Sequence, residues 1–112
     1  MTTITQVQLV APQQLGNADA TFYTAPAQTT AKIGRAVFTN TSASAVTITA
    51  GITPGGALGP STTMISARTL APGESYVSPE LAGAVLPSGS ALRAYSSAAA
   101  SVTFTASGLI VQ

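Results

Sequence analysis

The chain has 112 residues, the size of a single domain, and only 6% of them are charged although 46% are hydrophobic. An ordinary soluble domain carries about 25% charged residues, so small and polar side chains must cover most of this surface, which suits burial against other subunits. The absence of Cys and His excludes disulfides, thiolate chemistry, zinc-finger sites and imidazole catalysis, and a net charge of +1 from scattered residues offers no basic stripe for nucleic acid or a membrane.

The N-terminal residues 1–19 are predicted to form an extended arm that leads into a domain of residues 20–112. Within the arm, the run 4–10 has the composition of a strand, and an Ala-Pro pair ends it. We expect the arm to reach over a neighbouring subunit and to contact it through Ile4, Val7, Leu9 and Val10. The chain starts without a signal-peptide pattern, and no run reaches the roughly 18 apolar residues of a membrane span, so a cytoplasmic protein is expected.

The alternation of inward-facing and outward-facing residues that is typical of a strand becomes clearer in residues 32–40. Ala36 and Phe38 share one face of the predicted strand, while Ile33 falls out of phase with them. Gly34 lies between the two phases, at the position where a β-bulge would absorb one extra residue. We therefore predict a strand with a bulge at this glycine.

Shorter patterns flank this run. Residues 46–52 alternate cleanly, as expected for a half-buried strand, and residues 53–60 are rich in Gly and Pro, which predicts a loop tip that adds nothing to the core. Strands are also predicted at 20–24, at 91–96 and from 102 to 110.

A turn is predicted between two further segments. Residues 71–74 read Ala-Pro-Gly-Glu, which places Pro and Gly at the central positions of a type II turn. This turn would join a strand at 62–70 to a hairpin partner at 74–78. Residues 80–86 fit either a strand or one helical turn, and the pattern leaves both open.

Together these segments make about eight short strands at intervals of roughly 8 to 12 residues, with no amphipathic helix of useful length. The predicted fold class is all-β, an antiparallel two-sheet sandwich. An immunoglobulin-like and a jelly-roll-like topology both fit. Open sheet edges in such a fold favour pairing with other chains.

Few residues in this sequence could act in catalysis. The only side-chain carboxylates are those of Asp19, Glu74 and Glu80, and no two of them are predicted to lie side by side. Lys32 is the only lysine, and no sequence feature places a serine beside it to be activated. We therefore predict no catalytic residue, no cofactor and no metal site, and we expect the protein not to be an enzyme. Sugar binding remains an alternative, although without Trp the only polar aromatics available for stacking are Tyr23, Tyr76 and Tyr95.

Six motifs follow one another between residues 20 and 110. They are Phe22-Tyr23-Thr24-Ala25-Pro26-Ala27, Phe38-Thr39-Asn40-Thr41-Ser42 with Val46-Thr47-Ile48, Leu70-Ala71-Pro72-Gly73-Glu74-Ser75-Tyr76, Leu86-Pro87-Ser88-Gly89, Leu92-Arg93-Ala94 and Thr105-Ala106-Ser107-Gly108. In that order the chain resembles the small β-sandwich virion proteins of tailed bacteriophages, which include capsid decoration or cement proteins as well as tail and fibre components. The arm is not part of the shared pattern.

The resemblance implies a virion structural protein that is assembled in the host bacterial cytoplasm. The expected function is capsid decoration or cement, in which the protein binds and stabilises the head shell. Its expected partners are copies of itself, with a trimer favoured, and the major capsid protein or other virion proteins. A tail, baseplate or fibre subunit is one alternative, and a carbohydrate-binding or adhesin module is another. A neutral monomer coated with Ser and Thr would explain the composition without any partner.

Overall fold

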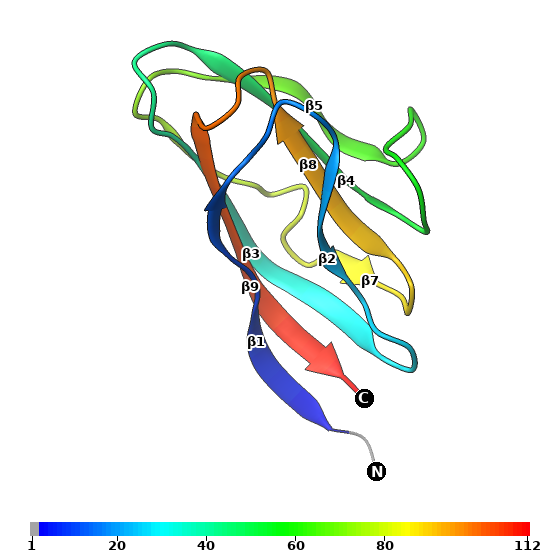
Figure 1. The fold of residues 1–112 in the computed structure, drawn as a ribbon. Coiled ribbons are helices and arrows are strands. Elements are labelled where there is room, and N and C mark those ends of the chain that lie inside the picture. Colours follow the sequence, from blue (N-terminus) through cyan, green and yellow to red (C-terminus); the bar gives the residue numbers. More distant parts are fainter. Residues whose placement is uncertain (1–2) are drawn as a thin grey trace.

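A computed structural model describes residues 3–112, which fold into two antiparallel sheets packed face to face (Figure 1). The strands of these residues are β1 (Ile4–Gln14), β2 (Ala20–Thr24), β3 (Thr30–Asn40), β4 (Val46–Thr53), β5 (Thr63–Leu70), β6 (Ser75–Val77), β7 (Val85–Leu86), β8 (Ala91–Ser96) and β9 (Val102–Val111). No helix in this part of the chain is long and apolar enough to cross a membrane. The predicted antiparallel sandwich is confirmed.

Sheet A has the strand order β1-β9-β3-β6, with β7 also paired to β3, and sheet B has the order β2-β8-β4-β5. Along residues 3–112 only β4 and β5 are consecutive strands that pair with each other, and almost every other connection crosses between the sheets. An immunoglobulin sandwich instead keeps several consecutive strands side by side. The order here is that of a jelly roll, which decides between the two topologies that the sequence left open.

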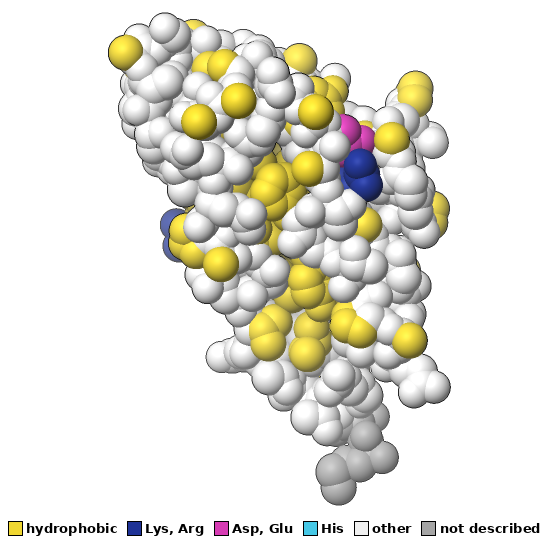
Figure 2. Space-filling model, viewed as in Figure 1, with side chains coloured by type: hydrophobic (Ala, Val, Ile, Leu, Met, Phe, Trp, Pro, Cys, Tyr) yellow, Lys and Arg dark blue, Asp and Glu magenta, His cyan; other side chains and the backbone are white. Residues whose placement is uncertain are grey.

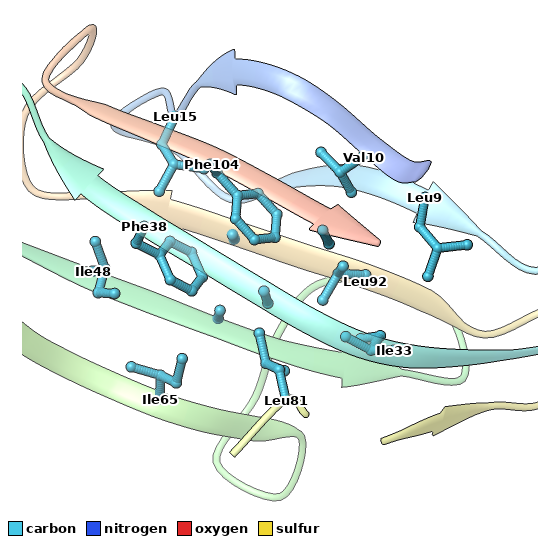
Figure 3. Packing of buried hydrophobic residues seen from close by; sticks show 14 of the residues in the cluster. Leu9, Val10, Leu15, Ile33, Phe38, Ile48, Ile65, Leu81, Leu92 and Phe104 are labelled. Carbon is cyan, nitrogen blue, oxygen red and sulfur yellow. The ribbon is translucent and has the colours of Figure 1, made fainter. Parts of the chain in front are cut away.

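The core lies between the sheets and is built around aromatic rings (Figure 3). Phe38 and Phe104 face each other across β3 and β9, with ring centroids 4.5 Å apart and nearly parallel planes. Phe22 from sheet B meets the Phe104 ring edge-on at 5.5 Å. Because Phe104 contacts both sheets, it joins the two layers of the sandwich.

The predicted bulge at Gly34 is confirmed, because the β3–β9 register shifts between Ile33 and Arg35. The type II turn at residues 71–74 is confirmed as well. Glu74 N–H donates to the Ala71 carbonyl at 2.9 Å, and Gly73 has a φ of 77°.

The predicted hairpin between residues 62–70 and 74–78 is wrong. β6 pairs with β3 in sheet A, whereas β5 pairs with β4 in sheet B. Gly73 N–H donates to the Asn40 carbonyl at 2.9 Å, and Asn40 N–H donates to the Glu74 carbonyl at 2.9 Å. The turn is therefore a corner at which the chain leaves one sheet and joins the other, held by these two backbone bonds to Asn40 at the end of β3.

The buried side chain of Asn40 holds this corner together. Its Nδ2 donates to the carbonyls of Ser44 and Leu70 at 2.8 and 3.1 Å, and its Oδ1 accepts from both N–H and Oγ of Ser42. A fully buried amide that makes every available bond specifies one geometry.

Replacing Asn40 with alanine is expected to lower the free energy of unfolding by about 2 kcal/mol, because the buried Leu70 carbonyl loses the side-chain donor that satisfies it. Urea denaturation measures this loss. Asn40→Asp should cost at least as much as the alanine change, because it places a buried carboxylate oxygen against the carbonyls of Ser44 and Leu70. An alanine variant as stable as the parent would contradict this role for the side chain.

Residues 79–84 are mostly in turns, and only the two residues of β7 form a strand, so neither reading of residues 80–86 holds throughout. Leu81 lies in the core although no strand carries it. The loop after β4 folds back over sheet B. A Cβ on Gly51 would lie 2.9 Å from Leu58 Cδ2 and 2.1 Å from the Thr62 carbonyl. The loop thus covers part of the outer face of sheet B.

Candidate interaction surfaces

Residues 4–14 of the predicted arm form β1, which pairs with β9 at the edge of sheet A. Met1 and Thr2 lie outside the described residues. The four predicted contact residues are not brought together on one surface. Leu9 and Val10 are 7% and 1% exposed and lie in the core, Val7 packs partly buried against the core, and Ile4 is 65% exposed.

The physical reason is a register shift between Gln8 and Val10. An extra residue at this point turns both Leu9 and Val10 inward, which simple alternation does not allow. Whether the segment also contacts a neighbouring subunit stays a prediction.

The first half of β1 offers free backbone groups. Thr3 and Gln112 exchange both N–H to carbonyl bonds, at 2.8 and 2.9 Å. In an antiparallel ladder, bonded pairs alternate with pairs whose backbone groups point away. The N–H and carbonyl groups of Ile4, Gln6 and Gln8 therefore point away from β9, toward the open side of sheet A.

The other edges are shorter or carry features that oppose pairing. β6 and β7 have three and two residues, and β2 has five and a register shift. β5 carries Arg68, and Ala67 in it has a left-handed φ of 47° that interrupts the ladder. β1 is an uncharged edge strand of 11 residues, and although it has two register shifts after Gln8, its residues 4–8 pair with β9 without a shift. It is therefore the best template for another strand among residues 3–112.

Edge strands β1 and β2 also carry partly buried apolar side chains. Val7 of β1 and Phe22 and Tyr23 of β2 pack against the core without being covered completely. In the space-filling view, hydrophobic atoms form a band along the seam between the two sheets (Figure 2). Charged side chains are sparse on this side of the molecule, as the composition predicts.

Sheet B carries an ion pair. Arg93 Nε lies 2.9 Å from Asp19 Oδ1, and the other oxygen of Asp19 accepts the Leu58 N–H at 2.8 Å. Burial raises the pKa of Asp19, but the hydrogen bonds from Arg93 and Leu58 and the charge of Arg93 outweigh it, so the pKa lies below its usual value. The pair fastens the loop after β4 to sheet B.

A second polar group joins β5 to the β6 corner. The Arg68 guanidinium lies 3.9 Å from the centroid of the Tyr76 ring, and the Tyr76 hydroxyl bonds to Glu80. That hydroxyl bond lowers the pKa of Glu80, although burial opposes it. Burial first and then Glu80 raise the pKa of Tyr76. Arg68 covers one face of the Tyr76 ring, so this face offers no open platform for a sugar.

Glu74 is also engaged, since its Oε1 accepts the Ala71 N–H at 2.7 Å and closes the turn. Two charged residues remain, Lys32 and Arg35, and neither has a hydrogen-bonded or ion-paired side chain among residues 3–112. No group of three potential metal ligands occurs in the same residues. Within the described residues, the charged side chains without a bonded or stacked partner are therefore the two basic ones on β3, Lys32 and Arg35.

The bulge at Gly34 places these cations together. Residues three apart in a regular strand point to opposite faces. Lys32 pairs with Leu109 and Arg35 pairs with Ser107, and those two partners are two residues apart on β9. Both cations therefore project from the outer face of sheet A, where they are exposed.

Two adjoining hollows lie on that face, and we call them together the sheet A groove. The larger has a volume of about 480 Å³ and the smaller about 320 Å³, and Ser107 lines both. Gly34 and Gly108 form the floor of the larger one, and the exposed Gly34 has no side chain to fill it. Gln6 and Gln8 of β1 line one side of the groove, and Arg35 and Val37 of β3 line the other.

The fold has counterparts among solved structures, whereas no family model and no curated protein matches the sequence. A structure of the Gx strain of infectious bursal disease virus superposes with a TM-score of 0.54 at 17% identity, over 99% of this chain and 32% of that chain. The crystal structure of the VP2 subviral particle of infectious bursal disease virus gives 0.53 at 17% identity, over 98% and 32%. This chain thus spans about a third of each of those chains and shares the sandwich fold of that part.

Proposed function

We propose that this chain is a bacteriophage virion structural protein, a capsid decoration or cement protein that binds the head shell and stabilises it. Its partners are copies of itself, with a trimer favoured, and the major capsid protein or other virion proteins. It is assembled in the host bacterial cytoplasm and acts on the particle as a structural subunit without catalysis.

The observation that carries the proposal is a jelly-roll sandwich with an almost uncharged exterior. Charge is depleted in the centre of protein interfaces because desolvating it is costly, and only 6% of this chain is charged. The fold similarity to chains from infectious bursal disease virus supports a role in a virus particle, although it extends over only 32% of each of those chains. The motif resemblance to phage virion proteins supports the narrower assignment.

The open edge of β1 supports contact by strand pairing. Free N–H and carbonyl groups at Ile4, Gln6 and Gln8 can add a strand from another subunit, and Ile4 adds exposed apolar surface. Such a contact depends on backbone hydrogen bonds and apolar burial more than on ion pairs. We therefore expect assembly to depend only weakly on salt.

Particles that lack the protein test the assignment. Heads without it should lose resistance to heat or to chelators, and adding the purified chain should restore that resistance. Imaging should then locate it on the head shell. Density on the tail or baseplate would replace the decoration role with the tail alternative, and unchanged particle resistance would contradict the cement role.

A proline substitution at Gln6 tests whether the open edge of β1 pairs with a strand of another subunit. Because the Gln6 N–H points away from β9, Gln6→Pro should leave the free energy of unfolding within about 1 kcal/mol of the parent and weaken particle binding about tenfold. Val7→Pro is the matched control, since it removes a donor within the β1–β9 ladder and should lower stability by about 3 kcal/mol. Co-sedimentation and urea denaturation measure the two effects. Gln6→Ala removes the same side chain from the sheet A groove but keeps the N–H, so it should weaken particle binding much less than Gln6→Pro. A Gln6→Pro protein that binds particles as tightly as the parent would exclude strand pairing at β1.

A further inference from the structure

The sheet A groove is a hollowed part of the surface that no other segment of residues 3–112 covers. The chain's own loop after β4 covers part of the outer face of sheet B, and the Asp19–Arg93 pair fastens that loop. The hollows on sheet A have no such cover within residues 3–112. A sheet face of this kind is available to a partner.

The charges on this face select the kind of partner. In a chain with four basic and three acidic residues, every charged side chain but Lys32 and Arg35 is engaged within the described structure. The bulge brings those two cations to one face, beside the groove. Bulges that re-aim side chains are typical of functional positions.

We propose that the sheet A groove binds an extended, acidic segment of a partner protein. Lys32 and Arg35 lie opposite β9 residues that are two apart, which corresponds to about 7 Å along a strand. Carboxylates that alternate with uncharged residues in an extended segment have the same spacing. The glycine floor lets the backbone of the segment approach closely, and Gln6 and Gln8 can both donate and accept hydrogen bonds at its side.

Two other occupants fit less well. A second copy stacked by the same face would oppose Lys32 and Arg35 to their own equivalents, which is unfavourable. Nucleic acid binding relies on several phosphate contacts and, for single strands, on aromatic stacking. Arg35 lines this groove and Lys32 lies beside it, opposite Leu109, and the lining contains no aromatic side chain.

The inference rests on the proposed virion role only for the identity of the partner, which would be another virion subunit. The first experiment uses a synthetic peptide, an acetylated and amidated Thr-Glu repeat of eight residues, with a Thr-Gln repeat as its uncharged match. NMR of the backbone amides should show changes at residues 32–35 and 107–109 with the Glu peptide at low salt. The Gln peptide should bind several-fold more weakly.

Variants make this test specific. Lys32→Gln with Arg35→Gln should weaken binding of the Glu peptide about three- to tenfold, and raising the salt should shrink the difference. The single variant Arg35→Gln should show part of this loss. Arg68→Gln is its matched control, because it also removes one charge but lies outside the groove, and it should leave binding of the Glu peptide unchanged. Equal binding of the two peptides, equal weakening by Arg68→Gln, or tighter binding of oligothymidylate at the same amides would overturn the inference.

Particles separate this inference from the proposed function. If the parent binds phage heads and the Lys32→Gln, Arg35→Gln protein binds about three- to tenfold more weakly, the groove takes part in that contact. If both bind equally tightly, the groove inference fails while the decoration role stands. If the parent binds no particle, the decoration role fails and the peptide result alone decides the groove.

Discussion

Replacing Phe104 with alanine is expected to lower the free energy of unfolding by about 3 to 5 kcal/mol. The ring is fully buried, stacks on Phe38 within sheet A and receives the edge of Phe22 from sheet B. Its removal leaves a cavity between the layers and abolishes both aromatic contacts at once. Since a domain of this size is stable by roughly 5 to 15 kcal/mol, the loss is a large part of the total.

A graded series makes this prediction sharper. Phe104→Leu should cost less than Phe104→Ala because most of the volume is retained, and Phe22→Ala should cost less because Phe22 is only partly buried. Urea denaturation of the four proteins gives the order. If Phe22→Ala destabilises the domain as much as Phe104→Ala, the central place of Phe104 in the core is wrong.

Replacing Gly108 with alanine is expected to disrupt the pairing of β3 with β9, at a cost of about 3 kcal/mol or more. A Cβ at this position would lie 1.9 Å from the Lys32 carbonyl oxygen and 3.0 Å from the Gly34 nitrogen. These are backbone atoms in the middle of sheet A, so they cannot move aside without breaking the ladder around the bulge.

Gly34→Ala is the matched control for Gly108→Ala because it lies in the same bulge. Its Cβ would meet the nearest atom, the Ser107 carbonyl oxygen, at 3.5 Å, which is an ordinary contact. We expect this variant to lose less than about 1 kcal/mol. Thermal unfolding of the two proteins tests the contrast, and a Gly108→Ala protein as stable as Gly34→Ala would show that the close approach does not constrain the sheet.

Local features of the fold were predictable from the sequence. Alternation located the strands at residues 46–52 and 102–110, and the phase error around Gly34 located the bulge. The Ala-Pro-Gly-Glu turn was recognisable because Pro and Gly have the backbone preferences that a type II turn requires. Each of these features depends on neighbouring residues alone.

The pairing of strands was not predictable in the same way. A type II turn reverses the chain but does not decide whether the next strand joins the same sheet or the opposite one. That choice depends on Asn40, which is 30 residues from Leu70 in sequence and bonds to its carbonyl only in the folded state. The choice of a jelly roll over an immunoglobulin-like order depends on similar contacts between distant segments.

The candidate interaction surfaces also depend on strand register, which the sequence pattern predicts only in part. Composition indicated an exterior covered by partners. Leu9 and Val10 were expected to contact a neighbour as apolar residues of the predicted arm, whereas a register shift turns both into the core. Strict alternation places Lys32 and Arg35 on opposite faces of the strand, and only the bulge that the sequence predicts at Gly34 brings them to one face. Recognising the groove required both the bulge and the glycine opposite it.

The central claim is that other virion subunits cover this uncharged exterior, and sedimentation of the purified chain with phage heads that lack it tests this most directly. We expect the chain to bind the heads saturably, at a fixed ratio to the shell subunits, and to lose no more at raised salt than the three- to tenfold share of binding that Lys32 and Arg35 supply. A chain that stays monomeric at high concentration and remains in the supernatant at every ratio would contradict the claim.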